Sequence, residues 1–169
     1  MQALTPFQMQ CLPMIQQVIA FPGWYKPSWM KPSQLMATVR VESGWDPSIK
    51  ASDYATTGSV GLMQVTADTA QAMGQQYGLD LSKGQTDPLT SFFTGAAYQD
   101  ATLRYLLQKW GVTEVPLSAV EEGYNEGYVA AARGSMVSLR YWLKWAFSQQ
   151  GYAFVDTAVT PAFLRASTK

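Results

Sequence analysis

The segment 87–111 constrains the fold of this chain most, because its apolar residues recur at helical spacing over the whole segment. Asp87-Pro88 provides a helix start and Gly111 a stop, since proline suits the first helical turn and glycine the left-handed conformation at a helix end. The apolar positions between them lie mostly three or four residues apart: Leu89, Phe92, Phe93, Ala96, Ala97, Leu103, Leu106, Leu107 and Trp110. This pattern predicts a central core helix in a mainly α fold.

Start and stop signals predict several shorter helices. Thr5-Pro6 is a good helix start, although Pro13 is expected to break or restart the helix that follows. Further helices are expected at about residues 33–44, 66–77 and 135–149, and from Pro116 onward. In the helix expected at residues 135–149, the side chains expected to face inward are Leu139, Trp142, Leu143 and Phe147.

Glycine occurs twice in the helical stretch that begins near Pro116, at positions 123 and 127. Each glycine in a helix costs about 1 kcal/mol relative to alanine, so another factor must favour these small residues. We expect a close approach of this backbone to a neighbouring element.

The rest of the chain shows little regular pattern. Residues 48–60 predict at most a short β-hairpin, and the tail from about residue 151 is expected to be loosely attached. A chain of 169 residues suits one domain and can bury roughly 70% of its unfolded surface. Because no repeat, low-complexity tract or linker divides the chain, we expect a single domain over residues 1–169.

Glu42 lies near the end of the helix expected from residue 33. Leu35, Val39 and Glu42 are spaced i, i+4, i+7, so the carboxyl group projects from the same stripe as two apolar side chains. A carboxyl on a buried helix face either finds a partner or retains its proton, and a proton held near neutral pH is what a general acid needs. The alternative is a glutamate at a helix end that points to solvent.

The chain contains three short motifs, and the first of them begins with this glutamate. In order they are Glu42-Ser43-Gly44-Trp45-Asp46-Pro47, Gly61-Leu62-Met63-Gln64 and Gly123-Tyr124-Asn125-Glu126-Gly127. Together they resemble the lytic transglycosylase domain of the soluble Slt type, related to goose-type lysozymes, over about residues 33–134. The resemblance implies a mainly helical lysozyme-like fold that cleaves the glycan strands of bacterial peptidoglycan between N-acetylmuramic acid and N-acetylglucosamine. It implies no metal and no organic cofactor.

The resemblance also implies a role for each motif residue. Glu42 would protonate the leaving oxygen and then act as base, while the 6-hydroxyl of the substrate's own muramic acid attacks and closes a 1,6-anhydro ring. Gln64 would hydrogen-bond the sugar or orient Glu42, and Met63 would line the groove. Tyr124 would approach Glu42 with its hydroxyl, and Asn125 would contact substrate or support its loop.

Two other acids leave hydrolysis open, because ordinary glycosidases use a second carboxylate. Asp46 precedes Pro47 and is better explained as a turn residue bonded to its own backbone. Asp53 lies between the motifs, near where goose-type lysozymes carry aspartates that position water. If Asp53 reached the site, the chain would be an inverting muramidase that uses Glu42 and Asp53; otherwise it is an exposed loop acid.

Two positions depart from the family's pattern. The family usually places a serine nine residues after the glutamate, where this chain has Ala51 followed by Ser52. A slip of one residue in the loop would let Ser52 contact the substrate's N-acetyl group. Glu126 replaces the small residue usual after Asn125, and this extra carboxylate would either alter substrate choice or face water.

The composition argues against several other functions. Lys and Arg number 12, as do Asp and Glu, and this neutral balance argues against nucleic acid as a partner. The absence of histidine removes Ser/His and Cys/His catalysis and the commonest metal ligand. The lone Cys11 lies in an apolar segment and is expected to be a buried thiol. No apolar run reaches the roughly 20 residues of a membrane span.

The route of such an enzyme to the cell wall or periplasm stays open. The first residues have no basic region ahead of their apolar residues, as a secretory signal requires. Delivery by a phage particle or a secretion apparatus would serve. The alternative to an enzyme is a non-catalytic component of such a particle or apparatus, which only binds glycan or a neighbouring subunit.

Aromatic residues in expected loops would suit either a sugar or a protein surface: Trp24, Tyr25, Trp29 and Tyr54.

Overall fold

The protein is mainly helical. The computed structural model describes residues 3–26, 29–51, 55, 58–133 and 139–166. Its helices are α1 (Pro6–Ile19), α2 (Pro32–Glu42), α4 (Ala67–Tyr77), α5 (Pro88–Trp110), α6 (Leu117–Glu126), α7 (Tyr128–Ala132) and α8 (Leu139–Ala166). Within these ranges the β structure consists of isolated antiparallel bridges, from Lys50 to Val60 and from Val60 to Val65. The predicted fold class is confirmed, and none of the helices described is both long and apolar enough to cross a membrane.

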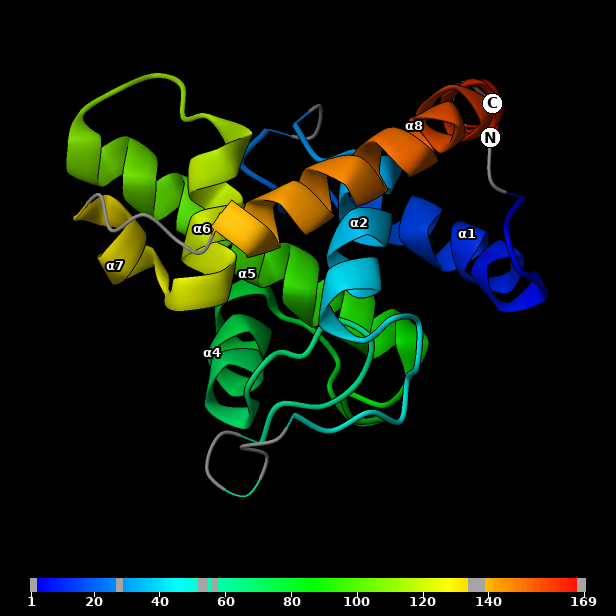
Figure 1. Cartoon of the computed structure of the whole chain (residues 1–169), viewed down its shortest axis with the longest axis horizontal. Coiled ribbons are helices and arrows are strands. Elements are labelled where there is room, and N and C mark those ends of the chain that lie inside the picture. The colour runs from blue at the N-terminus through cyan, green and yellow to red at the C-terminus, as the bar shows by residue number, and fades with distance from the viewer. Residues whose placement is uncertain (1–2, 27–28, 52–54, 56–57, 134–138, 167–169) are drawn as a thin grey trace.

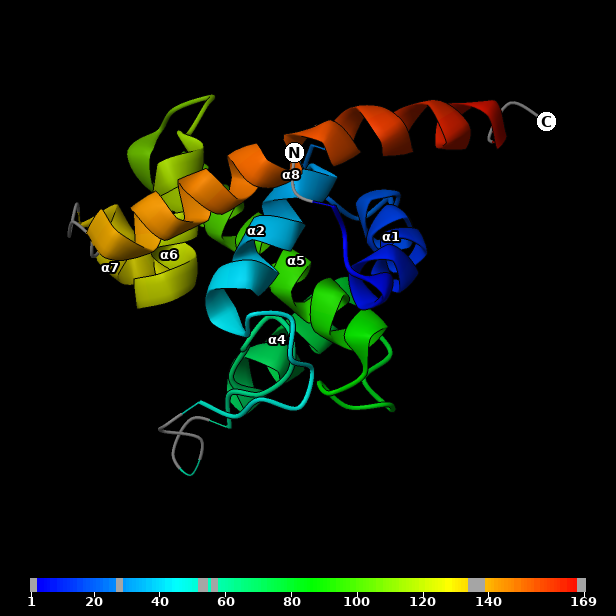
Figure 2. The same cartoon turned by 45° about the vertical axis from the view of Figure 1, so that its right-hand side comes forward.

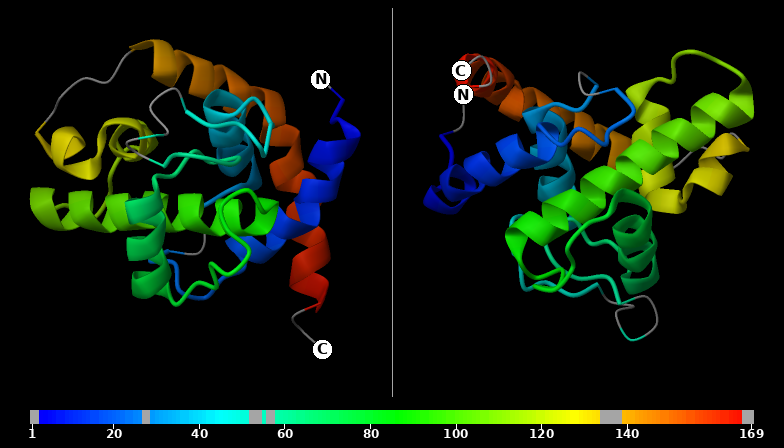
Figure 3. Two further views of the ribbon diagram at one scale, coloured as in Figure 1. Left: turned by 90° about the horizontal axis from the view of Figure 1, so that it is seen from below. Right: turned by 180° about the vertical axis from the view of Figure 1, so that it is seen from behind.

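Helix α5 runs through the middle of the molecule, with α1, α4, α6 and α7 packed against it (Figure 1; Figure 3). Asp87 caps its start by accepting a hydrogen bond from the backbone N–H of Thr90 at 2.9 Å. Gly111 ends it in the left-handed conformation, with φ of 65°. Phe92 has no exposed surface, so the predicted core helix is confirmed at both ends and along its inner face.

Helices α4 and α6 also begin where the sequence predicts. Thr66 caps α4 with its side chain, and Gly78 ends it with φ of 66°. In α6, a Cβ atom at Gly123 would lie 2.4 Å from Cγ2 of Thr102 on α5. Gly123 is therefore needed for close packing of the two helices, as expected. The same expectation is wrong for Gly127, which lies between α6 and α7 and where a Cβ atom would meet nothing within 4 Å.

Helix α1 begins at Pro6 after the Thr5 cap, as predicted, but it continues through Pro13. The expected break is wrong because Pro13 lies on the exposed side of the helix. The carbonyl of Met9, which a proline four residues later cannot bond, lies on that same side and can be hydrated.

Helix α8 continues well past residue 149 and crosses over α2 (Figure 2). Its Asp156 carboxyl accepts hydrogen bonds from the backbone N–H of Ser33 at 2.9 Å and from its hydroxyl at 2.8 Å, which caps the start of α2. The hydroxyl of Tyr152 accepts a hydrogen bond from Nε1 of Trp45 at 3.0 Å. The expected loose attachment of the tail is therefore wrong as far as Asp156.

The inward face of α8 also differs from the prediction. Trp145 and Val155 are each 1% exposed, whereas Leu143 is 44% and Phe147 70% exposed. The inward assignment of Leu143 and Phe147 is wrong, because the stripe that packs on α2 is offset from the one chosen from the apolar pattern. The side chains of Leu139 and Trp142 lie outside the described part of the helix.

The buried carboxyl of Asp100 on α5 fixes the loop that precedes α2. It accepts hydrogen bonds from the backbone N–H of Tyr25 at 2.9 Å and from Nε1 of Trp29 at 3.3 Å. It also accepts from the hydroxyl of Tyr77 at 2.9 Å and from Nε of Arg104 at 2.7 Å. Four donors offset much of the desolvation of this carboxyl, so its role is structural.

Candidate active site

The chain turns sharply directly after Glu42, the last residue of α2. The hydroxyl of Ser43 donates to the carbonyl of Val39 at 3.1 Å and accepts from the backbone N–H of Trp45 at 3.2 Å. Gly44 and Trp45 have φ of 61° and 75°. A left-handed tryptophan costs roughly 1–2 kcal/mol, which burial of its ring offsets. The indole packs against the rings of Phe7, Phe92 and Tyr152.

Glu42 is half-buried and accepts a hydrogen bond at Oε1 from the hydroxyl of Tyr141 at 2.7 Å. Burial raises the pKa of Glu42 from its ordinary value of 4.5 to about 7, and the bond from Tyr141 partly opposes this shift. Roughly half of the molecules then keep the Glu42 proton at pH 7. The carboxyl thus has the property that a general acid needs at neutral pH.

Tyr141 is a site residue that the sequence did not reveal. It lies on α8, 99 positions from Glu42, and no local motif surrounds it. The one signal in the sequence is its position four residues before Trp145, which places the two on the same stripe of the helix.

A cavity of about 330 Å³ lies beside Glu42. Of the predicted site residues, it brings together Glu42, Gln64, Tyr124 and Asn125. Among the described residues that line this cavity, only Glu42 carries a carboxyl group. Two further candidates, Ser52 and Asp53, lie outside the described residues. The full lining is Glu42, Ser59, Gln64, Val65, Thr66, Thr69, Tyr98, Tyr124, Asn125 and Gly127.

Gln64 reaches the cavity from a tight turn. A Cβ atom at Gly61 would lie 1.9 Å from the carbonyl oxygen of Gln85, so only glycine fits the start of this turn. Nε2 of Gln64 donates to the carbonyls of Ile49 at 3.0 Å and of Gly61 at 2.8 Å. Its amide nitrogen therefore braces the loop, rather than bonding Glu42.

Met63 does not line the groove as the family resemblance implied. Its side chain has no exposed surface, and it fills the space over Gly95, where a Cβ atom would lie 2.4 Å from Cε of Met63. The backbone of Met63 matters more, since its N–H donates to Oγ of Ser91 at 3.0 Å and its carbonyl accepts from the hydroxyl of Tyr124 at 2.5 Å. Met63 enters the core because Gly95 on α5 has no side chain to exclude it.

Tyr124 and Asn125 reach the cavity from the end of α6. Tyr124 is 8% exposed, and the charge on Glu42 contributes to raising its pKa well above the ordinary value, after burial. Tyr124 and Glu42 line the same cavity, but the Tyr124 hydroxyl donates its hydrogen bond to the carbonyl of Met63. Asn125 is exposed, and its Nδ2 donates to Oε1 of Glu126 at 3.1 Å.

A second cavity, of about 450 Å³, adjoins the first. Thr69, Tyr98 and Gly127 line both, so the two cavities are neighbours. Glu126 and Arg133 are exposed and contribute opposite charges to its lining.

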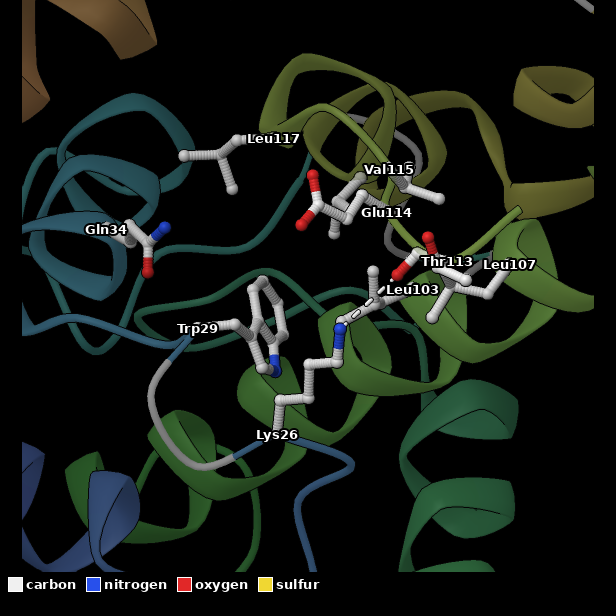
Figure 4. A pocket seen from close by; sticks show the side chains of 10 residues that line it. Lys26, Trp29, Gln34, Leu103, Leu107, Thr113, Glu114, Val115 and Leu117 are labelled. Atoms are coloured by element: carbon white, nitrogen blue, oxygen red, sulfur yellow. Dashed lines mark hydrogen bonds between the residues drawn. The ribbon is translucent and has the colours of Figure 1, made fainter.

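A separate cavity, of about 240 Å³, lies at the other end of α6 (Figure 4). Trp29 and aliphatic side chains of α5 and α6 line it, together with Lys26, whose Nζ donates to the carbonyl of Thr113 at 3.3 Å. Its ionisable side chains, Lys26 and Glu114, are exposed. This cavity lacks the desolvated acid that distinguishes the one beside Glu42.

The loop aromatics do not gather at the cavity beside Glu42. Trp24 is 3% exposed and packs against Phe21 and Tyr77, so it belongs to the core. Tyr25 and Trp29 are held by Asp100, away from that cavity's lining, and Tyr54 lies outside the described residues.

In the described parts of the chain, no group of three or more His, Cys, Asp or Glu side chains is arranged to hold a metal ion. Cys11 is a buried free thiol, as predicted, and burial raises its pKa to about 11.

The fold and the cavity together define a mainly helical domain with a partly desolvated glutamate at the end of a helix. Comparison with protein families identifies this domain: the Transglycosylase SLT domain matches residues 23–134, and the chain belongs to that family. The family predicted from the three motifs is thereby confirmed. Members are generally lytic transglycosylases, which act on cell-wall peptidoglycan. A search of curated proteins finds no match.

Proposed function

We propose that this protein is a peptidoglycan lytic transglycosylase that cleaves the β-1,4 bond between N-acetylmuramic acid and N-acetylglucosamine and leaves 1,6-anhydro ends. The observation that carries the proposal is the state of Glu42, whose pKa burial raises to about 7 in a cavity where no other described lining residue has a carboxyl group. An acid that keeps its proton at neutral pH can protonate a glycosidic oxygen.

In the first step, the protonated Glu42 gives its proton to the bridging oxygen as the bond to the muramic acid C1 breaks. The sugar ring gains oxocarbenium character, and Glu42 becomes a carboxylate. Its negative charge then lies beside a positively charged ring, which stabilises that state. The hydroxyl of Tyr141, 2.7 Å from Oε1, stabilises the carboxylate as it forms.

In the second step, the Glu42 carboxylate takes the proton from the 6-hydroxyl of the same muramic acid. The oxygen of that hydroxyl attacks C1 and closes the anhydro ring. Glu42 regains its proton, no water is consumed, and no metal or cofactor is needed. Gln64, Tyr124, Asn125 and Ser52 are proposed to bind the substrate around this carboxyl.

Hydrolysis would require a second carboxylate that holds a water molecule. Asp46 does not suit this task. It is exposed, accepts hydrogen bonds from the backbone N–H and hydroxyl of Ser48 at 2.9 Å and 2.7 Å, and these bonds lower its pKa. An inverting muramidase that uses Asp53 is therefore the remaining hydrolytic alternative, and the reaction products distinguish it.

The test is to digest purified sacculi with the wild-type protein and with Glu42→Gln, and to analyse the soluble muropeptides by liquid chromatography and mass spectrometry. The proposal predicts 1,6-anhydro ends from the wild type and no release by Glu42→Gln. Asp46→Asn is the matched control and should release the same products as wild type.

Reducing ends that incorporate oxygen from labelled water would replace transglycosylation with hydrolysis. A wild-type protein that binds sacculi without releasing muropeptides would favour the non-catalytic alternative, a component of a virion or secretion apparatus. We further propose that the enzyme acts at the cell wall or periplasm and is delivered there by a phage particle or a secretion apparatus.

A further inference from the structure

Four helices meet at a buried polar cluster, formed by Thr38 of α2, Gln99 of α5, Glu121 of α6 and Trp145 of α8. Nε2 of Gln99 donates to Oγ1 of Thr38 at 3.0 Å and to Oε1 of Glu121 at 2.9 Å. Nε1 of Trp145 donates to Oγ1 of Thr38 at 3.0 Å. None of the four side chains is more than 1% exposed, so the cluster is shielded from water.

Each helix of this cluster, apart from α5, also carries a residue of the candidate site. Thr38 lies four residues before Glu42, and Glu121 lies three residues before Tyr124. On α8, Trp145 lies four residues after Tyr141. Residues three or four positions apart occupy the same face of a helix, so the cluster lies about one turn from each of these site residues.

Glu121 is the one ionisable member of the cluster, and its surroundings favour the uncharged form. The carboxyl accepts hydrogen bonds from Nε2 of Gln99 and, at 3.4 Å from Oε2, from the hydroxyl of Thr38. These two bonds lower the pKa of Glu121, but burial, which raises it, is the largest effect. The titratable groups that influence it or are influenced by it are Glu42 from α2, Tyr124 from α6 and Tyr141 from α8.

None of these groups is a cation. Burial raises the pKa of Glu121 well above its ordinary value, and the negative charge of Glu42 raises it further. Both effects favour the protonated form of the Glu121 carboxyl.

We infer that Glu121 is a positioning residue for the reaction: through its hydrogen bonds with Gln99 and Thr38, it helps to hold the helices that carry Glu42, Tyr124 and Tyr141 in register on α5. The inference rests on the proposed function for its effect on turnover, but not for its effect on the cluster. It differs from a second catalytic carboxylate, because Glu121 does not line the cavity. It also differs from a charged neighbour that would raise the pKa of Glu42 by repulsion.

Two substitutions separate these roles. Glu121→Gln keeps the shape and the carbonyl acceptor and puts an NH₂ donor group in place of the O–H, so it imitates the protonated acid. We expect the turnover number on soluble glycan strands to stay within about twofold of wild type, with the same pH limit on the alkaline side. Glu121→Leu removes the acceptor for Gln99, and we expect turnover to fall roughly tenfold to a hundredfold with little change in KM, as a small misplacement of catalytic groups would produce.

Glu114→Gln and Glu114→Leu, in the exposed loop before α6, are the matched controls and should leave turnover and the pH limit unchanged. Circular dichroism should establish that each variant is folded. If Glu121→Leu does not fold, Trp145→Phe removes another donor of the cluster with a smaller change in shape, and it should lower turnover severalfold.

A readout independent of activity is hydrogen exchange of the Trp145 indole N–H, followed by NMR. Exchange should stay slow in Glu121→Gln and become at least tenfold faster in Glu121→Leu. If Glu121→Leu does not fold, the same increase is expected in Gln99→Leu. Three results would overturn the inference. The first is an alkaline limit that falls by a pH unit or more in Glu121→Gln, and the second is wild-type turnover in folded Glu121→Leu. The third is unchanged indole exchange in Glu121→Leu, or in Gln99→Leu where that variant takes its place. If the wild type cleaves no glycan, the proposed function fails, and the exchange measurement alone decides the role of Glu121.

Discussion

Replacing Glu42 by glutamine should abolish glycan cleavage and at the same time stabilise the fold at neutral and alkaline pH. Glutamine has nearly the same shape as glutamate, and its side-chain carbonyl can still accept the hydrogen bond from Tyr141. The substitution therefore removes the proton donor and the buried charge, and leaves the packing of α2 unchanged. Both effects have one cause, the desolvation of this carboxyl.

The magnitude follows from the pKa of Glu42, which burial raises from 4.5 to about 7. At 1.36 kcal/mol per pKa unit, ionised Glu42 lowers the free energy of unfolding by about 3 kcal/mol. Below pH 4.5 the group is protonated in both states and this effect is absent. Between 4.5 and 7 the unfolded chain binds fewer protons than the folded one, so stability falls as pH rises, and above 7 the loss is complete.

Urea denaturation of the wild type and Glu42→Gln at pH 4 and pH 8 measures this difference. At pH 4 the two proteins should be nearly equally stable, and at pH 8 the variant should be more stable by up to about 3 kcal/mol. For a chain of this length that corresponds to a rise in Tm of roughly 6–12 °C. Glu114→Gln is the control and should show no such pH dependence. A stability difference of the same size at both pH values would show that the buried charge of Glu42 is not its cause.

Four further substitutions test other parts of the structure. Tyr141→Phe removes a hydrogen bond that favours the ionised form of Glu42, so the alkaline limit of glycan release should move to higher pH; a limit that stays or falls would contradict this. Asp100→Asn places an amide where four donors converge and should lower the free energy of unfolding by about 2–4 kcal/mol in urea denaturation. Gly95→Ala crowds the buried Met63 and should lower the free energy of unfolding by about 1–3 kcal/mol in the same assay. At Gly151 an added Cβ meets no atom within 4 Å, so Gly151→Ala should raise the free energy of unfolding by up to about 1 kcal/mol.

The parts of the fold that the sequence predicts are those fixed by local chemistry. Asp87 and Gly111 bound α5 because capping needs only a few neighbouring residues, and Thr66 bounds α4 in the same way. The close packing at Gly123 was also predictable, because glycine inside a helix needs a reason.

The failures concern features that depend on long-range contacts. Pro13 does not break α1, because the carbonyl that it leaves free is on the solvent side. The inward face of α8 was misassigned, since aromatic and aliphatic residues occur around much of that helix and only its packing on α2 selects Trp145 over Phe147. Met63 appeared to be a groove residue from its motif, but the partner that buries it is Gly95 on another helix.

The candidate site divides in the same way. Glu42, Gln64, Tyr124 and Asn125 could be selected from motifs, and they line one cavity. Tyr141, which bonds Glu42, could not be selected, because a contact across 99 positions leaves no pattern in a single sequence.

The most direct test of the account is an NMR titration of the Glu42 side-chain carboxyl in protein labelled with 13C-glutamate, with Glu42→Gln used to assign the resonance. We expect a midpoint near pH 7, so that a large share of the Glu42 carboxyls hold the proton at neutral pH. A midpoint near 4.5, the ordinary value for glutamate, would contradict it, because Glu42 would then be ionised at neutral pH and would have no proton to give.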